Sequence, residues 1–392
     1  MELEKFEITV KTLQGLEEVL GRELLRLGAE DVELYERAVG CKGTKELLYR
    51  ANYELRTALR VLVPISTFTI NSADDLYTEA KKLPWNTYLN IYKTFAIDNA
   101  VKSEFFQNTT FAGLRLKDAI ADYFTEKSGK RPSVDTENPS VRINLYISGT
   151  KVIVSLDSSG EPLFKRGYRI AVGAAPLNEV LAAGLVQLSG WKQNCNFLDP
   201  MCGSGTIAIE AAMLAYSIPA QIKRAEFGFM RWRDFDLELW EKVRAGASAR
   251  IKNKNEFSYR IIANDSSDDA VRNTQKNVKN VGLDKFIETG QKSIEYNTTE
   301  GAAMHVIMNP PYGERLDKNN VEILYKKIGT ALKRNFAGAQ VWILSCNQLA
   351  INNIGLHHKQ RFHLKNGAME CKFMQFEIYE GSIKAKFREN IE

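Results

Sequence analysis

Residues 197–206 read Phe197-Leu-Asp-Pro-Met-Cys-Gly-Ser-Gly-Thr206, a short apolar strand that runs through a glycine loop into a helix. Gly203 and Gly205 permit tight turns and a close approach of the backbone to a ligand. Free backbone N–H groups at a helix start near Thr206 favour a negatively charged group. The stretch therefore predicts a cofactor site beside a strand end in an α/β domain.

Two kinds of cofactor match this loop. Gly203-x-Gly205-x-x-Ala208 fits a loose dinucleotide pattern. However, the carboxylate of Asp199 precedes the glycines and would repel a pyrophosphate. The next strand-end acid, Asp265, comes 60 residues after Gly205, whereas a dinucleotide fingerprint places it about 20 residues on. S-adenosylmethionine carries no phosphate, and Asp199 can attract its amino or sulfonium charge, so the sequence favours S-adenosylmethionine.

Asp265 has two possible roles. It follows the apolar strand expected at Tyr259–Asn264, where a ribose-binding carboxylate belongs. It could instead cap the next helix, and Asp268 or Asp269 could also provide that cap. The sequence leaves these alternatives open.

A second motif, His305-Val-Ile-Met-Asn-Pro-Pro-Tyr312, is a strand followed by a rigid loop. Pro310 and Pro311 fix φ and remove two backbone donors. The Asn309 side-chain oxygen and the Pro310 carbonyl can then accept both N–H bonds of an exocyclic base amine, which favours its attack on a methyl group. Tyr312 can stack on the target base, which must leave its own stack to enter. The alternative is a Pro-Pro turn after a buried strand. Together with the glycine loop, the motif favours a methyltransferase acting on a base amine.

Strands and helices alternate in the second half of the chain, which predicts a mainly parallel, doubly wound, Rossmann-like sheet. The expected strands are Asn196–Asp199, Tyr259–Asn264, Phe286–Thr289, His305–Met308 and Gln340–Ser345. One aromatic and basic segment, 217–255, interrupts the alternation. Packing of this insertion on the sheet is favoured over a lid or an RNA-facing surface, because large aromatic side chains are usually buried.

The first half of the chain predicts α+β structure. We expect an N-terminal subdomain over 1–60, a second domain over 61–160, a connector over 161–178 and the catalytic domain over 179–392. Helices are expected at Leu16–Leu27, Thr44–Leu59, Ala73–Leu83 and Leu114–Lys127. A strand at Val61–Ile65 is expected either to end at Pro64 or to lie at a sheet edge.

Composition limits the other classes of function. The 392 residues carry a net charge of +5, which allows an anionic partner without requiring one. Five scattered cysteines argue against a disulfide framework or a metal site. No apolar run reaches the roughly 18 residues of a membrane helix, and the N-terminus lacks a signal-peptide pattern. A cytoplasmic protein is expected.

The two motifs together resemble the class I RNA methyltransferases that carry an N-terminal THUMP domain. The best match is the bacterial subfamily that makes N2-methylguanine in large-subunit rRNA. The resemblance covers nearly the whole chain, and the stretches that match most specifically are 129–132, 155–157, 163–169, 175–182, 198–206 and 309–316. It implies a ferredoxin-like and THUMP region, followed by a methyltransferase domain with a C-terminal antiparallel hairpin.

The resemblance also implies roles for individual residues. The cofactor S-adenosylmethionine would be bound by Asp199, Cys202, Gly203, Ser204, Gly205, Thr206, Asp265 and Gln291. Asn309, Pro310, Pro311 and Tyr312 would form the target-base site. RNA would be held by Lys130, Arg131, Lys165 and Arg166, although Lys130 and Arg131 could equally form a solvated basic turn. The family often has acids where this chain has Ser267 and the stretch Thr289–Ser293, and Gln291 could replace the second of these.

The leading hypothesis is therefore methylation of guanine N2 in 23S rRNA. Methylation of adenine N6 in RNA or DNA uses the same tetrapeptide and stays open. A non-catalytic RNA-binding assembly factor is the alternative from another class, and the intact motifs argue against it. The sequence does not indicate an oligomeric state.

Overall fold

The computed structural model describes residues 4–171, 176–299, 302–311 and 318–378. The chain forms two compact units. The N-terminal unit comprises Met1–Thr12, Gly21–Lys165 and Arg224–Ala245. The C-terminal unit comprises Leu13–Leu20, Arg166–Lys223 and Gly246–Glu392. Tyr312, the rest of its motif to Leu316, and Ala175 lie outside the described residues.

One continuous sheet forms the framework of the N-terminal unit, in the order β2-β3-β1-β4-β7-β6-β5. Its strands are β1 Phe6–Lys11, β2 Glu30–Tyr35, β3 Ala38–Gly43, β4 Arg60–Thr69, β5 Phe95–Lys102, β6 Val141–Ser148 and β7 Lys151–Asp157. The helices that accompany it along the chain are α1 Glu17–Leu27, α2 Lys45–Glu54, α3 Ala73–Lys81 and α4 Thr109–Ser128, with the short η1 at Trp85–Thr87. The predicted helices are therefore confirmed, with ends that differ by a few residues, whereas the hairpin of β2 and β3 was missed.

The prediction for Pro64 is wrong. Pro64 lies inside β4, which continues to Thr69 and pairs with β1 on one side and β7 on the other. The register of β4 with β7 shifts between Pro64 and Ser66. A bulge interrupts the ladder locally, and proline, which has no N–H to donate, is tolerated there.

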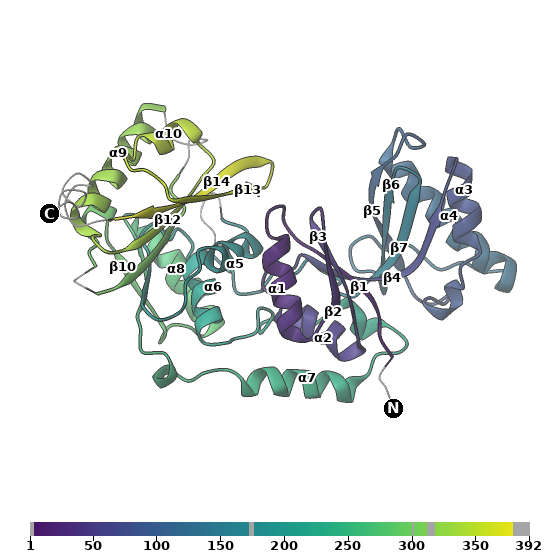
Figure 1. Ribbon diagram of the computed structural model, residues 1–392. Coiled ribbons are helices and arrows are strands. Elements are labelled where there is room, and N and C mark those ends of the chain that lie inside the picture. Colours follow the sequence, from purple (N-terminus) through teal and green to yellow (C-terminus); the bar gives the residue numbers. More distant parts are fainter. Residues whose placement is uncertain (1–3, 172–175, 300–301, 312–317, 379–392) are drawn as a thin grey trace. The chain divides into compact units, whose positions relative to one another are not determined.

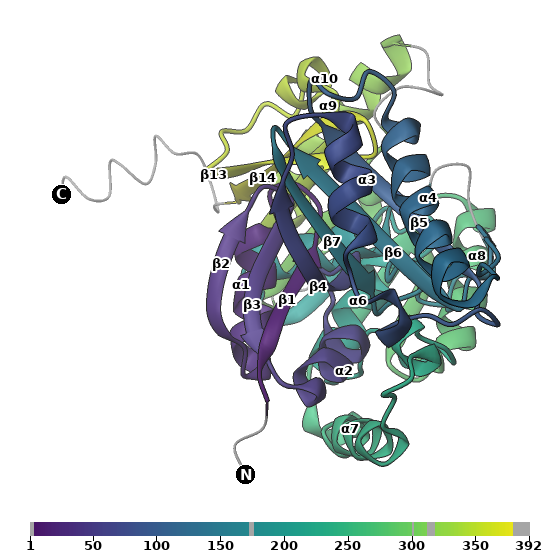
Figure 2. The same ribbon diagram turned by 90° about the vertical axis from the view of Figure 1, so that its right-hand side faces the viewer.

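Helices α3 and α4 cover one face of strands β4, β7, β6 and β5 (Figure 2). Their contact buries a hydrophobic core that includes Leu76 and Ala80 of α3 and Leu116 and Ile120 of α4. Ser72 caps α3 through a reciprocal bond with Asp75, and Gly129 ends α4 with φ 68°. These end signals are local, which explains why the sequence located both helices.

A mainly parallel sheet organises the C-terminal unit, in the order β10-β9-β8-β11-β12-β14-β13. Its strands are β8 Asn196–Asp199, β9 Ile261–Asp265, β10 Ile287–Gln291, β11 Met304–Met308, β12 Gln340–Ser345, β13 Gln360–Asn366 and β14 Met369–Glu377. The expected parallel strands and the antiparallel hairpin of β13 and β14 are confirmed.

Helices cover both faces of this sheet (Figure 1). On one side lie α5 Glu179–Leu188, α6 Thr206–Ala215 and α8 Asp268–Val281, and on the other lie α9 Lys318–Asn335 and α10 Gln348–Asn352. The core beneath α9 contains Val306 of β11, Ile343 of β12 and Ile328 of α9. This doubly wound arrangement leaves the carboxyl ends of β8, β9 and β11 at one edge of the sheet.

The expectation about cysteines needs one correction. Cys346 and Cys371 form a disulfide between the end of β12 and β14. These residues are 25 positions apart in the chain, and only the antiparallel pairing of the two strands brings them together. Cys41, Cys195 and Cys202 are free.

Neither a membrane span nor a metal cluster is found in the described part of the chain. None of its helices combines the length and the apolar character that crossing a membrane requires. No group of three or more His, Cys, Asp or Glu residues there is arranged to hold a metal ion.

Candidate active site

The glycine loop joins the end of β8 to the start of α6 as predicted. Gly203 and Gly205 both adopt left-handed backbone conformations, with φ 57° and 81°. A Cβ atom at Gly205 would lie 2.7 Å from Cγ2 of Thr274, which is too close. The loop therefore requires glycine at Gly205 for both its conformation and its packing.

Asp199 ends β8 and is almost fully buried, with 1% of its surface exposed. Its Oδ1 accepts a hydrogen bond from the Met201 N–H at 3.3 Å, while its Oδ2 is buried and has no partner among the described residues. Burial, and to a lesser extent the carboxylate of Asp265, raises the pKa of Asp199 well above its ordinary value. A buried carboxylate oxygen without a donor is suited to a cationic group of a ligand.

Asp265 ends the neighbouring strand β9 and holds the glycine loop. Its Oδ2 accepts a hydrogen bond from the Gly203 N–H at 2.9 Å, and its Oδ1 accepts one from the Ser267 N–H at 2.9 Å. The cap of α8 is Ser267, whose hydroxyl accepts from the Ala270 N–H. The capping alternatives at Asp265, Asp268 and Asp269 are therefore wrong.

The remaining predicted cofactor residues surround these two acids. The Cys202 N–H donates to the Asn264 carbonyl at 2.9 Å, and burial raises the pKa of the Cys202 thiol. The hydroxyls of Ser204 and Thr206 lie 3.3 Å apart and are buried. Gln291, at the end of β10, is exposed and donates to the Ser266 carbonyl at 3.2 Å.

Two buried residues of α8, which sequence reasoning missed, fix the carbonyl groups of the loop. The Thr274 hydroxyl donates to the Gly203 carbonyl at 3.1 Å, and the Asn277 amide donates to the Ser204 carbonyl at 3.0 Å. Both residues are fully buried. Polar residues three positions apart on the buried side of an amphipathic helix were the available signal, because buried polar groups need partners.

Asn277 also fastens the connector to the same loop. Its Oδ1 accepts from the Ile170 and Ala171 N–H groups at 2.9 Å, and its Nδ2 donates to the Ala171 carbonyl at 2.8 Å. Nearby, Arg169 donates to the Thr206 hydroxyl at 3.1 Å and pairs with Glu179. The connector is therefore bonded directly to the glycine loop and to the first residue of α6.

The RNA-binding prediction for Arg166 needs correction. Its side chain is fully buried, and its Nε lies 3.4 Å from Oε1 of Glu210, which also accepts from the Tyr168 hydroxyl. Arg166 therefore anchors the connector to α6 and offers no surface to RNA. Lys130, Arg131 and Lys165 are exposed, and Lys165 pairs with Glu161.

The second motif lies at the same sheet edge as the glycine loop. Strand β11 runs parallel to β8, with Val306 opposite Leu198, so Asn309 follows β11 where Asp199 ends β8. The Asn309 Oδ1 is buried and has no partner among the described residues. Pro310 is buried and Pro311 is exposed. One amide oxygen and one carboxylate oxygen, each buried and without a partner among the described residues, thus belong to adjacent strand ends.

The aromatic insertion packs inside the N-terminal unit. Phe227, Phe229 and Trp240 are buried, and the Phe229 ring stacks on Tyr49 of α2 with centroids 4.3 Å apart. Helix α7, Leu237–Ala249, begins in this region. The prediction that these aromatic side chains are buried is confirmed, but they pack against α2 and not against the parallel sheet.

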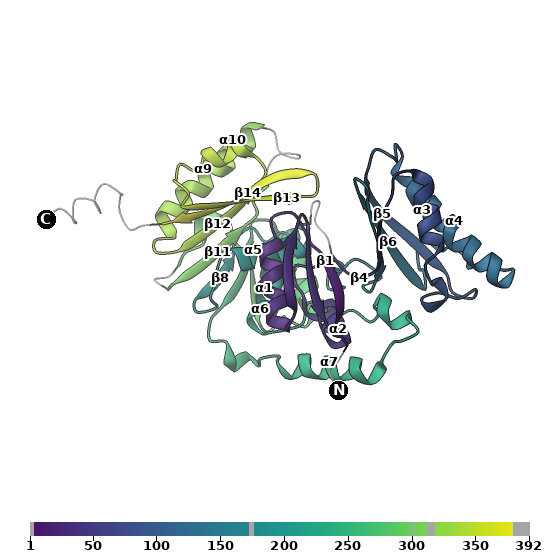
Figure 3. The same cartoon turned by 45° about the vertical axis from the view of Figure 1, so that its right-hand side comes forward.

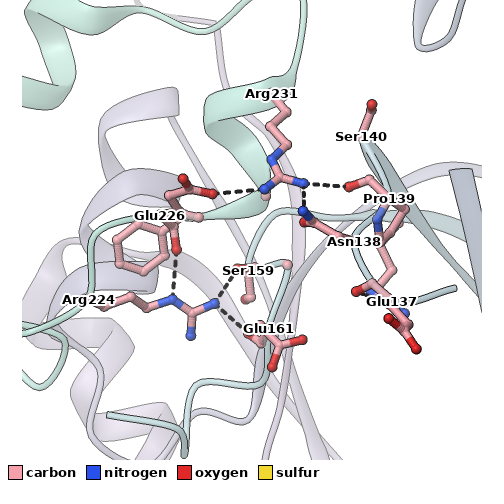
Figure 4. A pocket seen from close by; sticks show the side chains of 13 residues that line it. Glu137, Asn138, Pro139, Ser140, Ser159, Glu161, Arg224, Glu226 and Arg231 are labelled. Carbon is pink, nitrogen blue, oxygen red and sulfur yellow. Dashed lines mark hydrogen bonds and ion pairs between the residues drawn. The ribbon is translucent and has the colours of Figure 1, made fainter. Parts of the chain in front are cut away.

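Two arginines of the insertion line a cavity of about 120 Å³ in the N-terminal unit (Figure 4). Arg231 donates to the Asn138 side chain and the Pro139 carbonyl at 2.7 and 2.9 Å. Arg224 donates to the Ser159 and Glu161 carbonyls at 2.8 and 2.7 Å. Both guanidinium groups are therefore bonded within the protein, and the two arginines attach the insertion to the loops after α4 and β7.

The sheet order and the glycine loop define a Rossmann-like cofactor-binding domain. Three consecutive regions of the chain match models of known protein families. Residues 7–62 match the RlmL ferredoxin-like domain, residues 71–157 the THUMP domain, and residues 166–375 the RMKL-like methyltransferase domain. The chain belongs to the RMKL-like methyltransferase family.

Individual relatives agree with this assignment. The chain is 38% identical over 377 residues to the ribosomal RNA large subunit methyltransferase K/L of Marinomonas sp.. The alignment covers 94% of this chain and 52% of that protein, so the chain spans about half the length of the curated relative that it matches.

Solved structures share the fold over almost the whole chain. The crystal structure of SMU.472 in complex with SAH has a TM-score of 0.85 and 28% identity, and the match covers 97% of this chain and 100% of that one. A predicted N6-adenine-specific DNA methylase from Listeria monocytogenes has a TM-score of 0.85 and 29% identity, with 97% of each chain covered. The predicted family and fold class are confirmed.

Proposed function

We propose that this protein transfers the methyl group of S-adenosylmethionine to an exocyclic base amine of RNA, guanine N2 in 23S rRNA. The observation that carries the proposal is a pair of buried oxygens at one sheet edge, Asp199 Oδ2 and Asn309 Oδ1, neither of which has a partner in the part of the chain that the structure describes. One suits a cationic cofactor group and the other suits an N–H donor. A cytoplasmic location accompanies an rRNA substrate.

The residues of the glycine loop suit S-adenosylmethionine. Asp199 would neutralise its amino or sulfonium charge, and the N–H groups at the start of α6 would hold its carboxylate. Asp265, placed at the end of β9 beside the loop, would accept from the ribose hydroxyls, and Gln291 from β10 lies on the same edge. When bound, the cofactor supplies an electrophilic methyl group.

Asn309 would position the base. Its side-chain oxygen and the Pro310 carbonyl would accept the two N–H bonds of the amine, which localises the nitrogen lone pair for attack. Tyr312 would stack on the unstacked base. This mechanism depends on positioning and electrostatics, and it requires no strong base.

Large-subunit rRNA is the preferred substrate because the Marinomonas relative bears the name of a large-subunit rRNA methyltransferase and because a THUMP domain precedes the catalytic domain. Guanine N2 is the preferred acceptor because the motifs resemble those of the subfamily that makes N2-methylguanine. The name of the Listeria neighbour favours adenine N6 as a second candidate. Both acceptors are exocyclic amines, so the same site chemistry serves either.

The test is methyl transfer from labelled S-adenosylmethionine to large-subunit rRNA, followed by nucleoside analysis. We expect N2-methylguanosine. N6-methyladenosine would replace the proposal by the second candidate, and the absence of any labelled nucleoside would overturn both.

Asn309→Ala tests the mechanism. We expect the rate of methyl transfer to fall about a thousandfold, by analogy with the loss of a preorganised hydrogen-bonding group, while calorimetry shows retained cofactor binding. Asn255→Ala, at an exposed position of the short η3 helix Lys254–Glu256, is the matched control and should keep the full rate. Full activity of Asn309→Ala would contradict the mechanism.

A further inference from the structure

Strands β4, β7, β6 and β5 of the N-terminal unit, which we call the THUMP sheet, have one face that helices α3 and α4 do not cover. Val152 and Val154 of β7, and Leu145 and Ile147 of β6, point into the core beneath these helices. Helices α3 and α4 lie on one side of these strands (Figure 3). Because side chains alternate along a strand, the residues between those four point to the opposite side. We call this side the open face.

The strand registers arrange the open face in rows that cross β4, β7, β6 and β5. The first row is Thr67, Ile153, Tyr146 and Ala100, and the second is Thr69, Lys151, Ser148 and Lys102. Ile153 is half-buried, and the other seven residues are exposed. Tyr146 has 42% of its surface exposed although β6 is paired with a strand on each side.

The charges of these rows are of one sign. Lys102 and Lys151 are the charged members, and neither has an ion-pair partner among the described residues. The nearest acid in the next row, Asp98, is neutralised by Arg60 and Arg142. The open face therefore presents an aromatic ring, three hydroxyls and two unpaired cations.

These groups match the requirements of single-stranded nucleic acid. A tyrosine ring offers a stacking surface to any unpaired base, and flanking lysines neutralise the backbone. Lys102 and Lys151 lie two strands apart, roughly 10 Å, and Tyr146 lies on the strand between them, roughly 7 Å along that strand from their row. A protein partner would require a larger apolar patch than Tyr146, Ile153 and Ala100 provide.

We propose that the open face binds a single-stranded segment of the RNA substrate, with a base stacked on Tyr146 and phosphates beside Lys102 and Lys151. The inference rests on the proposed function, since it assigns a contact surface to the same RNA. The open face does not include Lys130, Arg131 or Lys165, which lie outside these strands.

The test measures binding of the full-length protein to a fluorescently labelled, mixed-sequence 12-nucleotide RNA, single-stranded or annealed to its complement. Tyr146→Ala should weaken binding of the single strand about tenfold and binding of the duplex less than twofold, while Tyr146→Phe keeps the affinity. Tyr92→Ala is the matched control, because Tyr92 is 86% exposed in the loop before β5. The double variant Lys102→Gln/Lys151→Gln should reduce the salt slope by about 1.4.

Two results would overturn the proposal that the open face binds RNA. One is wild-type affinity of Tyr146→Ala with unchanged thermal unfolding, and the other is an equal loss in Tyr92→Ala. Methyl transfer by the same preparations separates this proposal from the proposed function. If the wild type methylates rRNA while Tyr146→Ala binds normally, the surface is wrong and the function stands. If Tyr146→Ala alone loses single-strand binding but no variant transfers methyl groups, the surface stands and the function is wrong.

Discussion

The two sheets of this protein present functional groups in opposite ways. The parallel sheet places Asp199 and Asn309 at its carboxyl edge, where each has a buried oxygen without a partner in the described chain. The THUMP sheet places Tyr146, Lys102 and Lys151 on an exposed face. Each of the proposed catalytic groups would therefore have a large effect in a desolvated site, whereas each of the proposed RNA contacts would add a small, solvent-screened contribution.

The largest effect on cofactor affinity should come from Asp199→Asn, which tests the buried side of the comparison. The substitution keeps the size of the side chain and removes the charge that attracts the cofactor. We expect a loss of about a hundredfold in affinity for S-adenosylmethionine, because losing one partner of a buried charge pair costs about 2–5 kcal/mol. Calorimetric titration measures it, and an affinity within threefold of the wild type would remove Asp199 from the site.

The same variant should remove the pH dependence that Asp199 gives to the stability of the protein and to its cofactor affinity. Burial raises the pKa of Asp199, so the folded, ligand-free protein holds this proton more tightly than the unfolded chain. Its stability should therefore fall as the pH rises from the ordinary carboxyl range, near 4, through the raised value. Cofactor affinity should rise over the same interval, since the carboxylate is the attracting form. Asp199→Asn should flatten both profiles.

A smaller effect is expected from Asn277→Ala, which tests whether α8 preorganises the glycine loop. The variant loses the bond to the Ser204 carbonyl and three bonds to the connector. We expect the KM for S-adenosylmethionine to rise about tenfold, because each unsatisfied buried polar group costs about 1–3 kcal/mol, while kcat changes little.

Asn280→Ala is the control for that measurement. Asn280 lies on the same helix and donates to the Gly167 and Tyr168 carbonyls of the connector, and not to the carbonyls of the loop that Thr274 and Asn277 bind. It should lower the melting temperature and leave KM unchanged. Equal changes of KM in both variants would indicate that Asn277 acts only through the stability of the connector.

The smallest effect should come from Lys130→Gln/Arg131→Gln, on the exposed side of the comparison. Both side chains are exposed beyond the end of α4. We expect rRNA affinity to fall a few-fold, with a shallower salt dependence and unchanged cofactor affinity. A loss of rRNA affinity above a hundredfold would contradict the comparison, because these two exposed residues would then contribute as much as the buried groups do.

The sequence by itself was enough to predict the fold class and the two motifs of the candidate site. The glycines and the two prolines restrict the backbone locally, and the two strand-end acids are recognised because each follows an apolar run. The parallel strands were located to within two residues at each start because apolar runs between helices leave few alternatives. The family resemblance rested on the same motifs.

Tertiary structure alone decided the contacts between distant segments. Nothing local distinguishes buried Arg166, which pairs with Glu210, from exposed Lys165 beside it. The disulfide of Cys346 and Cys371 depends on the pairing of β12 with β14, and the role of Asn277 depends on the place where α8 meets the glycine loop. Sequence patterns fix the conformation of a segment, whereas burial and partnership depend on which other segment packs against it.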